Sequence, residues 1–217
     1  MSLRRKNSTF FSRIRSEITF FNYHIKDEIV PFEILGEVFY RNSAETNRRG
    51  LELGGDISLY KGFRFNLAYT LSDFVYDTYN ARVIELDSTG NFITIDRNFS
   101  GNFVPSIPKH NLNIALSYEK QLSPQTSLFG KLSYWYTSGM YVNDQNSEKT
   151  DGYRLLNAVG GLNFRIAPFD ILFSLGVDNI LDKTYVAFTN TNSVNGRFYE
   201  AGSPRNFYGS IKLGYLF

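Results

Sequence analysis

The amino-acid sequence predicts an all-β fold: an antiparallel up-and-down transmembrane β-barrel segment of about eight strands, with short periplasmic turns and long extracellular loops. Three observations predict this fold. Apolar and polar side chains alternate with a period of two, short and long connections alternate along the chain, and the last strand keeps its alternation up to a terminal aromatic residue, Phe217. We expect residues 1–217 to form one such segment, with residues 1–6 either vector-derived or poorly ordered.

The composition fits this prediction and excludes several other classes. Tyr, Phe and Trp make up 17% of the chain, and a membrane barrel spreads such rings over its lipid-facing surface and its interfacial girdles. The mean hydropathy of −0.26 is compatible with a barrel, because only alternate strand residues meet lipid. No apolar stretch reaches the roughly 18 residues that a spanning helix requires. The absence of cysteine excludes disulfides and thiolate metal sites.

The last predicted strand shows the alternation most clearly. Phe207, Ile211 and Leu213 fall on one face, while Ser210 and Lys212 fall on the other. The first strand is the least regular, because two serines interrupt its apolar face. Taken in chain order, the same split places the strands at residues 10–26, 51–60, 64–71, 111–119, 128–137, 156–165, 171–178 and 206–217.

The connections between these strands alternate in length. Short turns are predicted at residues 60–63, 120–126 and 167–169, and long polar loops at residues 27–49, 77–109, 139–153 and 182–205. If Phe217 lies at the periplasmic rim, every short turn is periplasmic and every long loop is extracellular. This is the asymmetry of outer-membrane barrels.

Charged residues on the predicted strands all fall on the polar face. An Arg or Lys facing lipid at mid-depth costs about 2–4 kcal/mol, so this face is expected to point into the barrel. The residues concerned are Glu52, Asp56, Arg64, Glu119, Lys131, Arg165, Asp178 and Lys212.

The segment Val177-Asp178-Asn179-Ile180-Leu181-Asp182-Lys183-Thr184-Tyr185 resembles a signature that precedes the last strand of TonB-dependent receptors, roughly V-x-N-L-F-D-K-x-Y. Gly202-Ser203-Pro204-Arg205 resembles the G-x-P-R that starts the family's last strand. Weaker echoes occur in residues 47–52, 104–110 and 152–157, in the order of the family's C-terminal third. Ile180-Leu181 replaces the commoner Leu-Phe, and Glu200-Ala201 stands where Pro is frequent.

This resemblance implies structural roles for Asn179, Asp182, Tyr185, Gly202, Pro204, Arg205 and Phe217. It also implies a barrel of about 22 strands closed by an N-terminal plug domain, and active uptake of a scarce ligand across the outer membrane of a Gram-negative bacterium. The ligand would be an iron-siderophore, haem, a corrinoid or a glycan. The plug and its TonB box are not part of this sequence. The implied partners are outer-membrane lipid, the TonB complex through the plug, and an extracellular small ligand such as a ferric siderophore, but not nucleic acid.

The sequence contains little that resembles a catalytic motif, and we expect neither an enzyme nor a cofactor. The sequence does not contain the residue spacing of a metalloprotease motif, a nucleophile elbow or a P-loop. The two histidines, His24 and His110, are interpreted as structural. Residues 144–152 space oxygen ligands like a calcium loop, but Lys149 occupies the sixth position, where an EF-hand needs Gly. We therefore expect a solvated loop and no metal site.

Six aromatic residues in the predicted outer loops are candidates for ligand contact, with a place in the aromatic girdle or loop packing as the alternative role. They are Tyr79, Phe92, Tyr141, Phe188, Phe198 and Tyr199.

Two other interpretations remain open from the residues alone. A complete small eight-stranded outer-membrane barrel would have a structural or adhesion role. A soluble β-sandwich would be a binding module with one wet face per sheet. A signal peptide directly before Asn7 would favour the small barrel, whereas a plug domain upstream would support the receptor.

Overall fold

A computed structural model describes residues 11–34, 37–193 and 199–215. Eight strands form one antiparallel sheet in the order β1-β2-β3-β5-β6-β7-β8-β11, and β4 pairs with the outer part of β3. The strands of this path are β1 (Phe11–Ile34), β2 (Glu37–Leu59), β3 (Phe63–Leu86), β5 (His110–Ser123), β6 (Thr126–Thr137), β7 (Tyr153–Ile166), β8 (Phe169–Asp178) and β11 (Asn206–Tyr215). The eight predicted strands correspond to the eight strands of this path.

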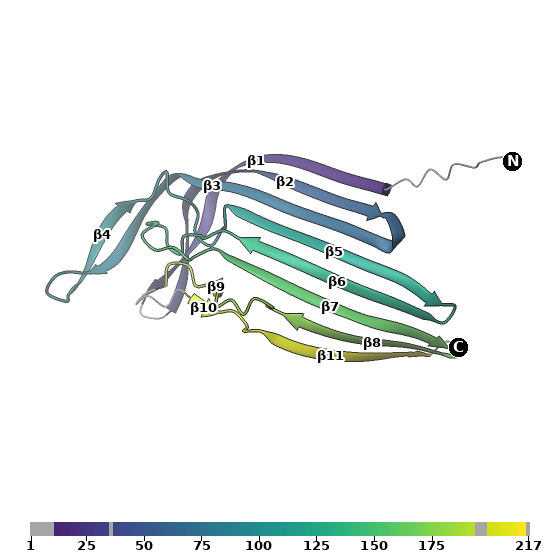
Figure 1. Cartoon of the computed structure of the whole chain (residues 1–217). Coiled ribbons are helices and arrows are strands. Elements are labelled where there is room, and N and C mark those ends of the chain that lie inside the picture. The colour runs from purple at the N-terminus through teal and green to yellow at the C-terminus, as the bar shows by residue number, and fades with distance from the viewer. Residues whose placement is uncertain (1–10, 35–36, 194–198, 216–217) are drawn as a thin grey trace.

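The sheet is a single curved layer, with β1 and β11 at its two open edges (Figure 1). The start of β1 and the end of β11 lie at the end where the turns are short, which we name the short-turn end. The long connections gather at the opposite, long-loop end (Figure 1). Strands β8 and β11 have 10 residues each, within the roughly 9–11 residues with which a tilted strand crosses a bilayer.

The strand register confirms the predicted division into two faces. Direct cross-strand partners share a face, and one row across the sheet consists of Arg13, Ser58, Arg64, Ser117, Lys131 and Val159. In the neighbouring row, Asn66 donates a hydrogen bond of 2.6 Å to Asp56. We name this side the polar face; the predicted strand charges fall on it.

The opposite, apolar face carries large side chains that no second layer covers. Ile18, Leu132, Leu175 and Ile211 are all exposed, and their rows consist mainly of aliphatic and aromatic residues. Contiguous exposed apolar surface of this kind needs a partner or lipid. No helix within the described residues is long and apolar enough to cross a membrane.

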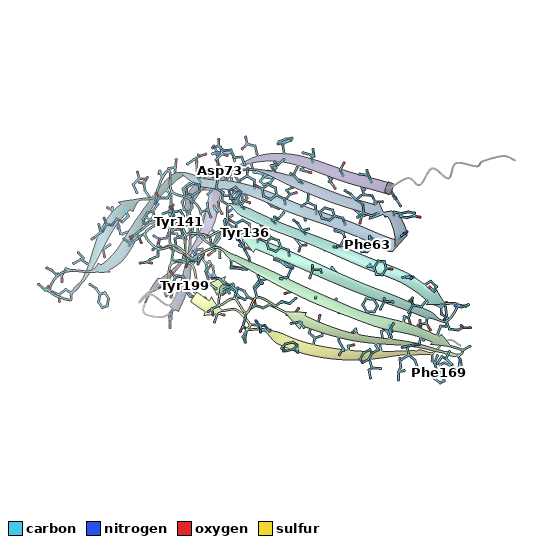
Figure 2. All side chains as sticks on the ribbon, viewed as in Figure 1. Phe63, Asp73, Tyr136, Tyr141, Phe169 and Tyr199 are labelled. Atoms are coloured by element: carbon cyan, nitrogen blue, oxygen red, sulfur yellow. The ribbon has the colours of Figure 1, made fainter. Side chains whose placement is uncertain are left out.

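Aromatic pairs occupy both ends of the apolar face. Phe63 lies 4.5 Å from Tyr118 between ring centroids, and Phe169 lies 5.6 Å from Tyr215, both at the short-turn end. At the other end the hydroxyl of Tyr69 shares a hydrogen bond of 2.9 Å with Nδ1 of His110. Figure 2 labels Phe63 and Phe169 at one end of the sheet and Asp73, Tyr136 and Tyr141 towards the other. These positions match the girdles of a membrane barrel.

The short turns lie where they were predicted. Tyr60–Gly62 forms a single 3₁₀ turn, in which Lys61 and Gly62 have φ angles of 62° and 89°. A Cβ at Gly62 would also clash with the carbonyl oxygen of Glu119, so the turn requires glycine. The next turn is reduced to Pro124 and Gln125, because β5 continues to Ser123.

Three of the predicted long loops contain strands that the sequence pattern did not predict. Strands β1 and β2 continue as a hairpin to Ile34 and Glu37, and β3 continues to Leu86. Strand β4 (Phe92–Asn98) pairs with this extension, and β9 (Val186–Thr189) pairs with β10 (Tyr199–Ala201). The reason is physical: beyond the bilayer both faces of a strand meet water or loops, so period-two hydrophobicity disappears while backbone pairing continues. Most residues of β4 are exposed.

Candidate functional site

The connections at the long-loop end meet around one buried carboxylate, Asp144. This residue lies in the connection between β6 and β7 and is 4% exposed. Its carboxylate accepts hydrogen bonds from the hydroxyls of Tyr76 (2.8 Å) and Tyr79 (3.1 Å) and from Nδ2 of Asn192 (2.9 Å). We name these four residues the Asp144 cluster.

Asn192 extends the cluster to two further segments. Its Oδ1 accepts from the backbone N–H of Asp144 at 2.8 Å, and its Nδ2 also donates to the carbonyl of Pro31 at 2.9 Å. Tyr76 and Tyr79 belong to the outer part of β3, Pro31 to the β1–β2 hairpin, and Asn192 to the connection between β8 and β11. The Asp144 carboxylate and the Asn192 amide together therefore join segments from all four long connections.

The electrostatics of the Asp144 cluster are dominated by burial. Desolvation raises the pKa of Asp144, although hydrogen bonds from Tyr76, Tyr79 and Asn192 act in the opposite direction. Burial, and then the charge of Asp144, raise the pKa of both tyrosines above their ordinary range. Both tyrosines are thus held protonated and act as hydrogen-bond donors.

The prediction of a solvated loop at residues 144–152 is wrong for its first residue and for Thr150, which is also buried. Thr150 pairs with Met140 through backbone and side chain, and this pairing folds the loop back on itself. No cluster of three metal-ligating side chains occurs among the residues that the structure describes.

Asparagine side chains fix the neighbouring backbone. Asn102 donates to the carbonyl of Asp144 at 2.7 Å. Asn146 binds both sides of Phe103, accepting from its N–H at 2.7 Å and donating to its carbonyl at 2.9 Å. The hydroxyl of Ser106 bonds to those of Thr189 (2.7 Å) and Thr191 (2.6 Å). The loops therefore form one hydrogen-bonded assembly.

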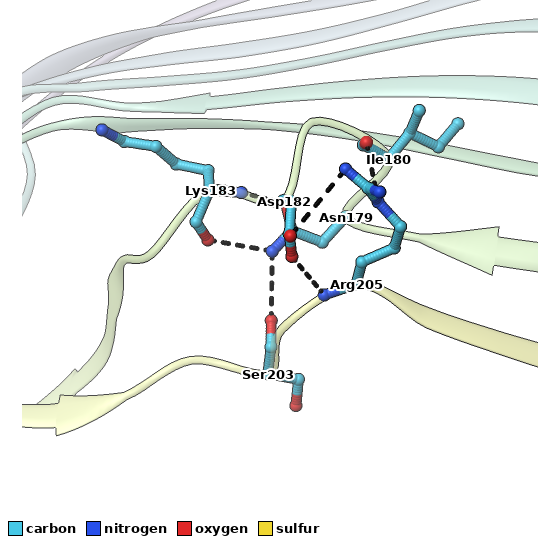
Figure 3. Close-up of polar contacts among 6 residues, drawn as sticks. All are labelled: Asn179, Ile180, Asp182, Lys183, Ser203 and Arg205. Carbon is cyan, nitrogen blue, oxygen red and sulfur yellow. Dashed lines mark hydrogen bonds and ion pairs between the residues drawn. The ribbon is translucent and has the colours of Figure 1, made fainter.

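The motif residues after β8 form a second structure, which we name the clasp (Figure 3). Asn179 is 3% exposed; its Nδ2 donates to the carbonyls of Lys183 (2.9 Å) and Ser203 (3.1 Å), and its Oδ1 accepts from the N–H of Lys183 (2.9 Å). Its φ of 51° lies in the left-handed region that Asn tolerates better than most residues. Asn179 thereby closes the turn after β8 and holds the segment that leads into β11.

Asp182 and Arg205 complete the clasp. The N–H of Arg205 donates to Oδ1 of Asp182 at 3.1 Å, and Nε of Arg205 donates to the carbonyl of Ile180 at 3.1 Å. Gly202 lies against the ring of Tyr185, and a Cβ there would clash with that ring. Tyr185 in turn packs 4.6 Å from Tyr153 between ring centroids. Pro204 stands between Ser203 and Arg205 in the chain. Phe217 lies outside the described residues.

The predicted ligand-contact residues occupy different environments. Tyr79 has no exposed surface, and its hydroxyl is engaged by Asp144. Phe92 is exposed at the start of β4, on a hairpin that projects beyond the other loops (Figure 1). Phe188 and Tyr199 are exposed on the two strands of the β9–β10 hairpin. Phe198 lies outside the described residues.

Tyr141 lines a pocket between β3, the β4–β5 connection and the β6–β7 connection. Sequence reasoning missed Asp144, Tyr76 and Asn192 as the centre of the loop assembly. The only available signal was an acid and an amide in polar loops, and these are typical of solvated loops.

Comparison with known proteins shows the same architecture. The family described as "TonB dependent receptor-like, beta-barrel" matches residues 5–180. Among solved structures, the ferric yersiniabactin uptake receptor FyuA of Yersinia pestis has 17% identity and a TM-score of 0.65, over 92% of this chain and 27% of that one.

Two proteins of Acinetobacter baumannii are similar to this chain over 91% of its length and 26% of theirs. The siderophore receptor PiuA has 18% identity and a TM-score of 0.63, and the ferric preacinetobactin receptor BauA has 17% identity and a TM-score of 0.60. The chain therefore spans about a quarter of the length of the structures it matches.

Proposed function

Because the chain belongs to the TonB-dependent receptor β-barrel family, we propose that it forms the C-terminal wall and part of the extracellular loops of a receptor for active nutrient uptake. The proposed location is the outer membrane of a Gram-negative bacterium, with lipid on the apolar face. The polar face would line the barrel interior around a plug domain, through which the TonB complex supplies energy.

The observation that carries the proposal is the ordering of the long loops by the Asp144 cluster. Loops that only cap a structural barrel need no shared buried carboxylate, whose desolvation is costly unless hydrogen bonds compensate it. Here three side-chain donors satisfy that carboxylate. The result is a preformed surface above the polar face, which suits recognition of an external ligand.

A ferric siderophore is the ligand class we propose. The relatives named above are described as receptors for siderophores or ferric chelates, and this supports the choice over haem, a corrinoid or a glycan. Exposed loop aromatics such as Phe92, Phe188 and Tyr199 are proposed as contacts, together with Tyr141.

The architecture favours a receptor over the two other interpretations. A closed eight-stranded barrel would pair its first and last strands, whereas β1 and β11 are the open ends of the sheet. A sandwich would cover the apolar face with a second sheet, whereas the main sheet of the described residues is one layer.

Uptake of radioactive iron tests the proposal. Cells that lack the protein should lose accumulation of iron from a ferric siderophore under iron limitation and regain it on complementation. Growth is measured in parallel with haem as the sole iron source, with a corrinoid as the sole cobalamin source and with a glycan as the sole carbon source. Normal iron uptake in the deleted strain, with loss of growth on one of the other sources, would replace the proposed ligand. Normal uptake of all four would overturn the transport function.

A further inference from the structure

A pocket of about 240 Å³ lies at the long-loop end of the polar face. Its floor includes Ser72 and Phe74 of β3, which continue the alternation that places Arg64 and Thr70 on that face. The volume is below the roughly 300–1,000 Å³ that encloses a whole drug-sized ligand. The pocket therefore fits one ring-sized group of a larger ligand.

Two parallel rings form one side of this pocket. Phe103 and Tyr141 stack with centroids 5.9 Å apart and an interplanar angle of 15°. Their two segments are tied together by hydrogen bonds: the side chain of Asn146 binds the backbone of Phe103, and the N–H of Ser106 donates to the carbonyl of Tyr141 at 2.7 Å. The stack is thus in place before any ligand arrives, which lowers the entropic cost of binding a further flat group.

An ammonium group lies over each of the two rings. Nζ of Lys109 is 5.7 Å from the centroid of Phe103, and Nζ of Lys149 is 5.3 Å from that of Tyr141. Both lysines line the pocket, and its lining among the described residues includes no carboxylate. Asp73 lies 3.9 Å from Lys109, but it also pairs with Arg49 at 2.7 Å. The pocket is therefore positively charged at its aromatic wall.

We infer that this pocket binds a planar aromatic anion, with its ring against the Phe103–Tyr141 wall and its negative charge at Lys109 and Lys149. The inference rests on the proposed function in one respect: the bound group is part of the transported ligand. A neutral sugar ring brings no negative charge to the two ammonium groups, whereas an aromatic anion matches the rings and the charges together. Phe74 and Met140 supply the remaining apolar surface.

The test uses the natural full-length protein in detergent micelles, with 2-naphthoate as the probe and neutral 2-naphthamide as its matched analogue. We expect calorimetric titration to show at least tenfold tighter binding of the naphthoate. The double substitution Lys109→Met and Lys149→Met should weaken naphthoate binding at least tenfold and remove the preference over the amide, because it deletes the charges and keeps apolar side chains.

Lys61→Met is the control. Lys61 lies 5.2 Å above the ring of Tyr60, so the same kind of pair is altered at the short-turn end, and affinity should not change. Heat-modifiable gel mobility verifies that each variant is folded. Absence of naphthoate binding, equal affinity for the amide, or equal affinity of the double variant would overturn the inference.

Iron uptake by cells that carry the wild-type protein separates this inference from the proposed function. If wild-type cells import a ferric siderophore while the protein fails to bind naphthoate, the pocket inference fails and the function stands. If naphthoate binds with the expected preference while no siderophore iron is imported, the proposed function fails and the pocket assignment stands.

Discussion

The hydroxyl of Tyr76 donates a hydrogen bond of 2.8 Å to Oδ1 of Asp144, although 68 residues separate the two along the chain. Both residues are buried, so the Tyr76 hydroxyl depends on Asp144 as its hydrogen-bond acceptor. Tyr79 lies beside Tyr76, with ring centroids 4.7 Å apart, and donates to the second carboxylate oxygen. The outer part of β3 and the β6–β7 connection are thereby fixed to one another.

Asp144→Ala should release the loops without unfolding the sheet. The substitution leaves the hydroxyls of Tyr76 and Tyr79 without their acceptor and removes one of the two hydrogen bonds from Nδ2 of Asn192. Each unpaired buried group costs about 1–3 kcal/mol. We expect faster amide hydrogen exchange in residues 138–152 and 186–193, with unchanged protection of β5 to β8. Hydrogen exchange followed by mass spectrometry measures both.

Asp151→Ala is the matched control, because Asp151 belongs to the same connection and is exposed. Its loop exchange should equal that of the wild type. Equal exchange in the Asp144 and Asp151 variants would show that the cluster does not hold the loops.

Alkaline pH should loosen the same cluster. Because the pKa of Tyr76 and of Tyr79 is raised in the docked loops, their stabilisation is fully present below the ordinary tyrosine pKa of about 10 and is lost as the pH rises through the raised values. Because the pKa of Asp144 is also raised in the docked loops, its contribution to docking likewise becomes more favourable as the pH falls. We expect ultraviolet titration to show late, cooperative ionisation of these tyrosines, absent from a Tyr76→Phe and Tyr79→Phe variant.

Asn179→Ala should destabilise the clasp more than Asn179→Gly. Both lose the hydrogen bonds to Lys183 and Ser203, worth about 0.5–1.5 kcal/mol each. The alanine variant is destabilised further, because its Cβ disfavours the positive φ of this position, whereas glycine adopts it freely. Urea unfolding in lipid vesicles should therefore rank stability as wild type, glycine, alanine, with the exposed Asn80→Ala close to wild type. Equal stability of the two Asn179 variants would contradict the role of the backbone conformation.

Adjacent residues on β6 test which face meets lipid. Leu132→Arg places a charge at the middle of the apolar face and should cost about 2–4 kcal/mol. Ser133→Arg places the same charge on the polar face, beside Ala115 and Asn157, and should be far less harmful. Insertion into vesicles and the free energy of unfolding measure the difference; a greater loss for the Ser133 variant would reverse the assignment of the faces.

The sequence predicted the eight sheet strands and their faces because lipid and a polar interior impose opposite demands on alternate residues such as Ile211 and Lys212. That constraint ends at the bilayer surface, so the outer parts of β1 to β3 and the whole of β4 carried no such pattern. Asp144 could not be identified because its partners, Tyr76 and Asn192, are distant in sequence. The aromatic criterion selected Tyr79 and Phe92 alike, although one is fully buried and the other exposed.

Every strand of the main sheet pairs with the strand that precedes it in the path, and β4 and the β9–β10 pair branch off without interrupting that order. Each new pairing therefore closes only one loop, and doubling a loop's length adds only about 0.6 kcal/mol. The sheet can grow by successive hairpins. The Asp144 cluster, in contrast, brings together residues of three long connections at once, and Asn192 links it to the fourth through the carbonyl of Pro31. Its formation thus reports that this whole stretch of the wall has assembled.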